Sequence, residues 1–296
     1  MSSSPCPQVG VVIPVYNDWD RLLLCLDALA LQTYPAERFQ VRVVNNGSSD
    51  WPEHPRFPLT VEVLAHDEPG SYGARNRAAL NWSVQVLAFT DADCLPEPDW
   101  LEQGVRALLT AGDPWPVLAG RIRLDAGLPL QPTAAEQLDQ ILGFDQARTV
   151  RRAGYGVTAN LFVAQALLQD LGGFHAQTRS GGDRDFCRRA CLTGVSLAYA
   201  DAAVVRHPAR DWHGLLEKQR RIVGGRLTLT GRGPSDRLQV LWLSLRPWVS
   251  ESVRVMRHRS LPLIRRLQLL TLVMRLRLAV LREWMRLQWQ GQVPLR

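Results

Sequence analysis

Short β-branched apolar runs alternate with segments of helical apolar spacing over the first hundred residues, and this alternation limits the possible folds most strongly. The runs occupy residues 9–15, 40–44, 61–65 and 86–90, and each is followed by a polar or glycine-bearing turn. Between them, residues 22–30 and 74–82 have the three-and-four spacing of amphipathic helices. This order predicts an α/β fold with a mostly parallel sheet covered by helices on both faces. Ligands of such sheets bind at the carboxyl ends of the strands.

Charge is divided unevenly along the chain. Residues 1–210 contain 18 basic and 23 acidic side chains, whereas residues 211–296 contain 17 basic and only 5 acidic ones. The basic C-terminal part predicts a polyanionic partner, and membrane phospholipid and nucleic acid are the two candidates. The five cysteines have no metal-binding pair spacing, and the first residues lack a basic and then apolar leader. We therefore expect a cytoplasmic protein.

The strongest chemical signal is the segment FTDADCLPEPDWL at residues 89–101. An apolar strand that ends in Asp91 and Asp93 presents two carboxylates at the edge of the sheet. Such hard oxygen ligands suit Mg²⁺ or Mn²⁺ bridging a diphosphate. The alternative is a solvated turn in which Asp93 caps the next helix. We predict a divalent metal site, because a strand precedes the pair and a proline-rich turn with Trp100 follows it.

Two further strand ends and one glycine-rich turn suggest a nucleotide pocket. After the first strand, Tyr16 is placed to stack on a base, and after the second, Asn45 and Asn46 are placed to bind its edge; an ordinary Asn-Gly turn is the alternative for the second stretch. In PGSYGARNRAAL (69–80), two glycines precede Arg75 near a helix N-terminus. Backbone N–H groups and a guanidinium can meet phosphate oxygens there, and a solvated helix face is the alternative.

The segment SGGDRDFCRRACLTG (180–194) places Asp183 at the start of a helix. A carboxylate there can accept the proton of an attacking hydroxyl, and we expect the helix N-terminus to lower the pKa of Asp183. An aspartate that only caps the helix is the alternative. His207 lies in VVRHPARDW and is predicted to bind the metal or the acceptor, with a purely structural histidine as its alternative.

Taken together, five segments resemble family-2 glycosyltransferases, which are inverting enzymes with the GT-A fold, over about residues 8–226. VVIPVYN and VVNNGSSD resemble the nucleotide-binding turns of the family, and GSYGARN resembles its diphosphate-side loop. DADC resembles the D-x-D metal motif, and GGDRDFCRR resembles the motif of the catalytic base. GVTANLFV, which contains Asn160, resembles the stretch before the acceptor site.

The resemblance implies a role for each matching residue. Asp93 would hold the metal and the diphosphate, Asp91 would lie nearer the ribose, and Asp183 would be the base. The full predicted donor site comprises Pro14, Tyr16, Asn17, Asn45, Gly47, Arg75 and Asp91; the metal ligands are Asp93 and His207, and the acceptor side has Asn160, Gly182 and Asp185. Two positions depart from the family: Asn45 stands where an aspartate is common, and Gly182 stands where many relatives have glutamate.

The C-terminal part predicts an amphipathic helix. One stripe contains Leu263, Leu267, Leu270, Met274, Leu278, Leu281 and Met285, and the remaining arc contains Arg265, Arg266, Arg275, Arg277, Arg282 and Arg286. No uncharged apolar run is long enough to span a bilayer. We expect a GT-A-like catalytic domain at residues 1–226 and a basic helical tail at 227–296 that lies on an anionic membrane. Packing of the stripe on the catalytic domain, or in a dimer seam, is the alternative.

These features predict transfer of a sugar, with inversion, from a nucleotide-diphosphate donor to a hydroxyl of a saccharide or lipid-linked acceptor in polysaccharide or glycolipid biosynthesis. A nucleotide-sugar-binding scaffold at the membrane is the competing hypothesis. A sugar-1-phosphate nucleotidyltransferase would place a glycine- and basic-rich loop after the first strand, where this chain has PVYNDWD. Nucleic-acid binding is not expected, because no nucleic-acid motif accompanies the basic residues.

Overall fold

The computed structural model describes residues 6–53, 55–112, 114–125, 132–178, 180–229 and 234–289. The chain forms two compact units. The α/β unit comprises Met1–Arg123, Asp145–Gln177 and Gly182–His207, and the helical unit comprises Leu124–Phe144, Thr178–Gly181 and Pro208–Arg296.

Within the described residues, eight strands of the α/β unit form one sheet in the order β3-β2-β1-β4-β7-β6-β8-β5. They are β1 (Val9–Val15), β2 (Phe39–Asn45), β3 (Val61–Ala65), β4 (Val86–Thr90), β5 (Leu95–Pro96), β6 (Val117–Asp125), β7 (Asn160–Ala164) and β8 (Leu197–Pro208). Strands β3, β2, β1 and β4 are parallel, whereas β7 runs antiparallel to β4. The predicted α/β fold and its four N-terminal strands are confirmed.

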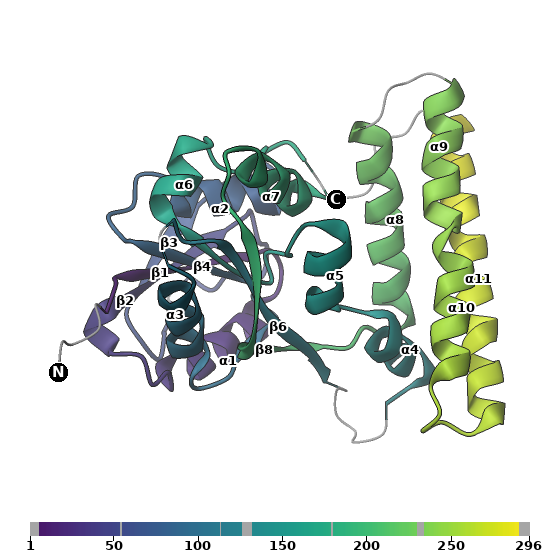
Figure 1. Cartoon of the computed structure of the whole chain (residues 1–296), viewed down its shortest axis with the longest axis horizontal. Coiled ribbons are helices and arrows are strands. Elements are labelled where there is room, and N and C mark those ends of the chain that lie inside the picture. Colours follow the sequence, from purple (N-terminus) through teal and green to yellow (C-terminus); the bar gives the residue numbers. More distant parts are fainter. Residues whose placement is uncertain are drawn as a thin grey trace. The chain divides into compact units, whose positions relative to one another are not determined.

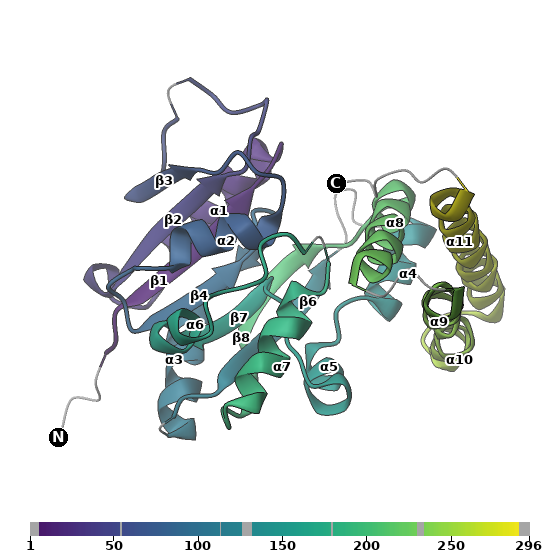
Figure 2. The ribbon, with the colours of Figure 1, turned by 90° about the horizontal axis from the view of Figure 1, so that it is seen from above.

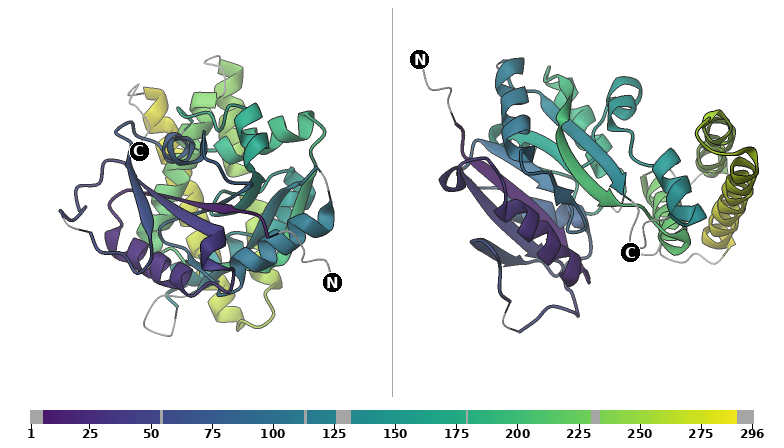
Figure 3. Two further views of the ribbon diagram at one scale, coloured as in Figure 1. Left: turned by 90° about the vertical axis from the view of Figure 1, so that its left-hand side faces the viewer. Right: turned by 90° about the horizontal axis from the view of Figure 1, so that it is seen from below.

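Helices cover both faces of this sheet. Figures 1 and 2 show α2 (Ser71–Ala79), α6 (Gln165–Asp170) and α7 (Gly182–Leu192) along one face, and α1 (Trp19–Ala30) and α3 (Trp100–Ala111) along the other. The helix α5 (Gln146–Ala153) and a 3-10 turn at Ala36–Arg38 complete the unit. The central strands β1 and β4 are buried on both sides, and this explains why their sequences are almost continuously apolar. Figure 3 shows the twist of the sheet.

The helical unit has its own core. It contains α4 (Ala134–Leu142), α8 (Trp212–Leu229), α9 (Pro234–Leu245), α10 (Pro247–Arg257) and α11 (Leu263–Trp289). Helices α9 and α10 run alongside α11 (Figures 1 and 3). Buried side chains of α4, α8, α10 and α11 pack together in this core, and they include Leu138, Leu215, Val255, Leu269, Val273 and Leu276. The predicted C-terminal helices are therefore present, but they belong to a bundle that also recruits α4.

The buried face of α11 differs from the predicted apolar stripe. Leu269, Val273, Leu276 and Val280 are buried, whereas members of the predicted stripe are exposed: Leu263 (59%), Leu267 (48%), Met274 (44%), Leu278 (47%) and Met285 (40%). The helix thus has apolar side chains on two faces. In addition, Arg277 does not lie on a solvated arc, because it is buried and paired with Glu251. Within the described ranges, no helix combines the length and hydrophobicity needed to cross a bilayer.

A buried carboxylate stabilises the helical unit. Asp139 is 2% exposed, accepts a hydrogen bond from the Arg210 backbone N–H at 3.0 Å, and lies 3.6 Å from Nζ of Lys218. The side chains of Arg210 and Lys218 also contact the Phe144 ring.

Asp139→Asn would leave two largely buried cations without their counter-charge, and removal of one partner of a buried ion pair costs about 3–5 kcal/mol. We expect a clear loss in the midpoint of urea unfolding followed by circular dichroism. The control is Glu217→Gln, which removes an exposed acid from the same unit. Equal midpoints for the two variants would contradict this account.

Candidate active site

The turns after β1 and β2 are tied together by side-chain hydrogen bonds. The Asn17 side-chain carbonyl accepts from the Ser49 N–H at 2.8 Å, and the Ser48 hydroxyl accepts from the Asn17 N–H at 3.0 Å. The Asn45 side-chain carbonyl accepts from the Ser48 N–H at 2.9 Å. Gly47 has a φ of +75°, which explains the glycine at this turn. The predicted donor-site residues Asn17, Asn45 and Gly47 are therefore brought together.

The Asn45 turn also leaves a donor group available. The side-chain amide nitrogen of Asn45 makes no hydrogen bond within the part of the chain that the structure describes. Tyr16 is 46% exposed beside Val15, which pairs with Asn45, and Pro14 lies one residue further inside β1. An exposed ring and an amide N–H at one sheet edge can stack on a base and bind its edge.

Asn46 has a structural role instead of the predicted contact with a base. It is 6% exposed, its amide nitrogen donates to the carbonyls of His66 and Glu68, and its carbonyl accepts from the Gly70 N–H. These bonds hold the loop that leads into α2. Both polar atoms of the Asn46 side chain thus bind backbone groups of the protein, so the side chain is not available to a nucleotide.

Arg75 connects the glycine-rich turn to the acidic motif. It lies on α2, is 3% exposed, and forms an ion pair with the Asp91 carboxylate. The solvated helix face is thereby excluded for Arg75. Its Nε is buried with no hydrogen-bond partner among the described residues. A buried arginine with an open donor is an arrangement that accommodates an additional anionic oxygen.

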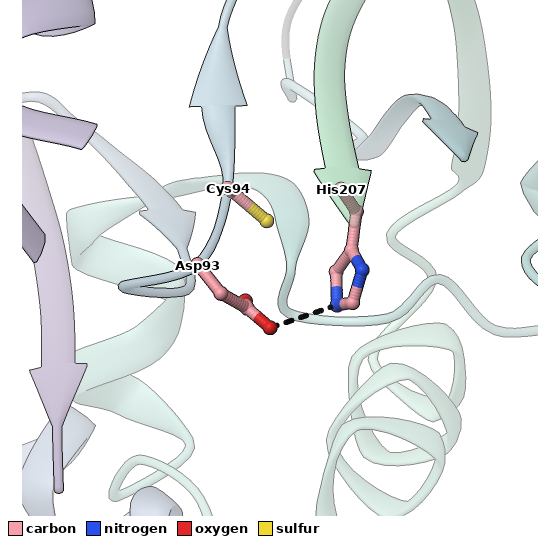
Figure 4. A group of neighbouring side chains, drawn as sticks. All are labelled: Asp93, Cys94 and His207. Atoms are coloured by element: carbon pink, nitrogen blue, oxygen red, sulfur yellow. Dashed lines mark ion pairs between the residues drawn. The ribbon is translucent and has the colours of Figure 1, made fainter. Parts of the chain in front are cut away.

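Asp93 points toward His207 (Figure 4). Its Oδ2 lies 3.4 Å from Nε2 of His207, which is 2% exposed at the end of β8. The antiparallel pairing of β5 with β8 brings these two residues together, because Leu95 lies opposite Arg206. The two aspartates of the D-x-D motif thus have different partners: Asp91 pairs with Arg75, and Asp93 lies beside His207.

The donor set around Asp93 fits a divalent metal. Ligand atoms of Asp93, Cys94 and His207 lie within 4.8 Å of one another. Burial, assisted by the Asp93 and Asp91 carboxylates, raises the pKa of the Cys94 thiol well above its usual range. The thiol donates a hydrogen bond to the Ala159 carbonyl at 3.8 Å, and a soft sulfur ligand suits hard Mg²⁺ or Mn²⁺ poorly. A carboxylate and an imidazole remain, and these two ligand types would suit a divalent metal.

Asp183 lies in the first turn of α7, as the sequence predicted. It is 9% exposed and accepts a hydrogen bond from the Arg184 N–H at 2.8 Å. The expected lowering of its pKa is wrong: burial raises the pKa of Asp183, and the Arg184 N–H, the Arg75 charge and the Tyr72 hydroxyl only partly oppose this. Desolvation of the carboxylate exceeds the effect of the helix N-terminus.

The neighbour of Asp183 explains the unusual glycine at position 182. A Cβ atom at Gly182 would lie 2.8 Å from the ring of Tyr72, so the ring occupies the space of a side chain. Tyr72 is 6% exposed and its hydroxyl hydrogen-bonds to Asp183. A role for Tyr72 was not predicted from the sequence, although this residue lies in the GSYGARN segment close to Arg75.

The other acceptor-side predictions fare differently. Asn160 is completely buried; its amide donates to the carbonyls of Arg121 and Ala203, and its carbonyl accepts from Nε1 of Trp100. An acceptor role for Asn160 is therefore not supported, because all its polar atoms join strands and α3. Asp185 is partly exposed and pairs with Arg189 at 2.8 Å and with His175 at 3.4 Å.

Comparisons with known proteins identify the family of the chain. The profile described as Glycosyl transferase family 2 matches residues 10–122. Glycosyltransferase AglE of Haloferax volcanii is 36% identical over 231 residues, which cover 76% of this chain and 75% of that protein. Pre-mycofactocin glycosyltransferase of Mycobacterium tuberculosis is 30% identical over 69% of this chain and 44% of that protein.

Solved structures share the fold. A mannosyltransferase from Pyrobaculum calidifontis, in complex with GDP-Man and Mn²⁺, has a TM-score of 0.61 at 17% identity and covers 97% of this chain and 88% of its own. TarS of S. aureus with UDP-GlcNAc has a TM-score of 0.51 at 18% identity, over 95% of this chain and 73% of its own. The curled, mostly parallel sheet therefore matches GT-A glycosyltransferases. On its sequence relatives and its sheet, the chain belongs to glycosyltransferase family 2.

Proposed function

We propose that this glycosyltransferase moves a sugar from a nucleotide-diphosphate donor to an acceptor hydroxyl with inversion and with the help of a divalent metal. The observation that carries the proposal is the position of Arg75. It pairs with Asp91 of the D-x-D motif and its charge also acts on Asp183 of α7. The Arg75 guanidinium therefore interacts both with Asp91, on the donor side, and with Asp183, the proposed base.

The donor side follows from the strand ends. The Tyr16 ring stacks on the base, the Asn45 amide N–H binds its edge, and Asp91 lies beside the ribose. Asp93 and His207 hold Mg²⁺ or Mn²⁺, which, when bound, offsets the charge of the leaving diphosphate. The Mn²⁺ and GDP-Man named for the mannosyltransferase of similar fold support this assignment.

The acceptor side requires a base. The acceptor oxygen forms a bond to C1 of the sugar from the face opposite the diphosphate, and the C1–O bond to the diphosphate breaks. Asp183 takes the hydroxyl proton as this happens. A single displacement of this kind inverts the configuration at C1. The raised pKa of Asp183 makes its carboxylate a stronger proton acceptor than a solvated aspartate.

The stereochemistry of the product tests this proposal. We would incubate the chain with UDP- and GDP-sugars and saccharide acceptors, and determine the anomeric configuration of the product by NMR. Inversion at C1 is expected. Retention would overturn the single-displacement role of Asp183, and donor binding without any transfer would favour the nucleotide-sugar-binding scaffold.

Tyr72→Phe is predicted to move the acidic limb of the activity profile to higher pH. Asp183 acts only when ionised, so activity is lost as the pH falls through its pKa. The Tyr72 hydroxyl lowers that pKa by stabilising the carboxylate, and its removal raises it. The measurement is kcat/KM against pH, with Tyr199→Phe as the control because that hydroxyl bonds to Asp201. A limb that stays in place, or moves to lower pH, would contradict the assignment.

We also propose that the helical unit rests on an anionic membrane at the cytoplasmic face, where the acceptor is lipid-linked and serves polysaccharide or glycolipid synthesis. Exposed apolar side chains on α11 and the excess of arginine in the C-terminal part support this. Failure of the wild-type chain to bind anionic vesicles at low salt would argue against this proposal. Substitutions are the suitable test, because truncation of α11 would uncover the core of the unit.

A further inference from the structure

A basic pocket lies between α8 and α11, within the helical unit. It has a volume of about 500 Å³, and Arg220, Arg275, Arg282 and Arg286 line it together with Glu283 and Trp212. Three of these arginines are spaced at seven and four residues along α11, so they share one face of the helix. The sugar-transfer mechanism uses none of them.

The pocket has more positive than negative charge. Glu283 is 5% exposed, and its carboxylate accepts a hydrogen bond from Arg286 at 2.6 Å and lies 3.9 Å from Arg220. One carboxylate thus faces four guanidinium groups. Such a pocket favours an anion.

Two of the arginines, Arg275 and Arg282, have no acidic partner among the residues that the structure describes. The Arg275 guanidinium lies 5.1 Å from the centroid of the Trp212 ring. Arg282 forms no hydrogen bond or ion pair within the described part of the chain. Guanidinium groups offer several N–H donors in a planar fork, and this geometry matches the oxygens of a phosphate group.

An apolar strip adjoins the arginines. Leu278 lines the pocket and is 47% exposed, while Met274 and Met285 lie one and two turns away on α11 and are 44% and 40% exposed. A soluble phosphate would neutralise the arginines and leave this strip in water. A phosphate that carries hydrocarbon chains would satisfy both features, because its chains can cover the strip.

We propose that this pocket binds the phosphate headgroup of an anionic membrane lipid, with the chains of the lipid along Met274, Leu278 and Met285. The inference rests on the proposed membrane association and deepens it by naming the site and the ligand chemistry. A general attraction between a basic surface and an anionic membrane would involve all surface arginines, whereas the proposed site makes vesicle binding depend mainly on Arg275 and Arg282.

The test uses the full chain and sedimentation with phosphatidylcholine vesicles, with and without phosphatidic acid. The pocket variant is Arg275→Gln with Arg282→Gln. The matched control is Arg257→Gln with Arg259→Gln, which removes the same charge from exposed positions of the helical unit. Diffuse attraction gives every arginine near the surface a similar share. We expect the pocket variant to lose affinity for phosphatidic acid vesicles by about tenfold more than the control.

Further arms make each outcome decisive. Leu278→Gln retains all arginines and is expected to weaken vesicle binding, while inorganic phosphate at equal phosphate concentration should not displace the protein. Equal losses for the two double variants, or displacement by inorganic phosphate, would overturn the lipid site. Sugar transfer to a water-soluble acceptor is measured without vesicles in each variant, so failure of the pocket is separated from failure of the catalytic proposal. Absence of wild-type binding to any anionic vesicle would overturn the membrane association as well.

Discussion

Asp183→Asn is expected to lower kcat for sugar transfer by about 100- to 10,000-fold, which is the usual contribution of a general base. Asparagine has nearly the same size and its carbonyl can still accept from the Arg184 N–H, so the N-terminus of α7 should be retained. The substitution removes the proton acceptor together with the negative charge on which Arg75 acts. Donor affinity, measured by isothermal titration calorimetry, should change little.

The control for this prediction is Asp185→Asn, two residues along the same helix. Asp185 pairs with Arg189 and His175 and lies on the partly exposed side of α7. It should keep most of the transfer activity. Comparable losses for the two variants would show that the helix is disturbed as a whole, and unchanged kcat in Asp183→Asn would exclude this carboxylate as the base.

Removal of the divalent metal is expected to have an effect of at least similar size. A bound cation contributes several kcal/mol of charge stabilisation when a diphosphate departs, and this corresponds to roughly a thousandfold in rate. EDTA should abolish measurable transfer, and Mn²⁺ should restore it. Asp93→Asn should weaken Mn²⁺ binding, which electron paramagnetic resonance detects without any turnover.

Cys94→Ala provides the matched control for the metal site. The thiol lies among the candidate ligands, but it donates to the Ala159 carbonyl, and sulfur is a soft ligand that suits Mn²⁺ poorly. Mn²⁺ affinity should therefore be close to that of the wild-type chain. Loss of Mn²⁺ binding in Cys94→Ala, together with normal binding in Asp93→Asn, would reverse the assignment of the ligands.

The parts of the site that the sequence predicted are those at strand ends. The β-branched runs define β1, β2 and β4, and the polar residues that follow them must meet at one edge of a parallel sheet. Asp91 and Asn45 are predictable for this reason. His207 was predicted as a metal or acceptor ligand from its residue type alone. Its position beside Asp93 depends on the pairing of β8 with β5, which joins residues more than a hundred positions apart and is not visible in the local sequence.

Other features depend on tertiary packing that local sequence does not encode. Asn160 and Asn45 are both asparagines at a strand end, yet one is completely buried among backbone carbonyls and the other is partly exposed. The contact of Tyr72 with Gly182 and Asp183 joins segments far apart in the chain. For the same reason, the pKa of Asp183 could not be derived from the helix N-terminus without its burial.

The helix α11 shows the same limit. Its period predicts a helix, and a helix is present. Two of its faces carry apolar side chains, and only the positions of its neighbouring helices decide which face is buried. Five members of the predicted stripe are exposed, whereas Leu270 packs against the core of the unit and the buried face was not predicted.

Incubation of the wild-type chain with Mn²⁺, a panel of nucleotide sugars and a mixture of saccharide and lipid-linked acceptors, followed by mass spectrometry, tests the central claim most directly. We expect the mass of an acceptor to increase by one sugar residue as a nucleoside diphosphate appears, and both products to form at least about 100-fold more slowly with Asp183→Asn. Nucleoside diphosphate and glycosylated acceptor formed equally by the wild-type chain and by Asp183→Asn would contradict it.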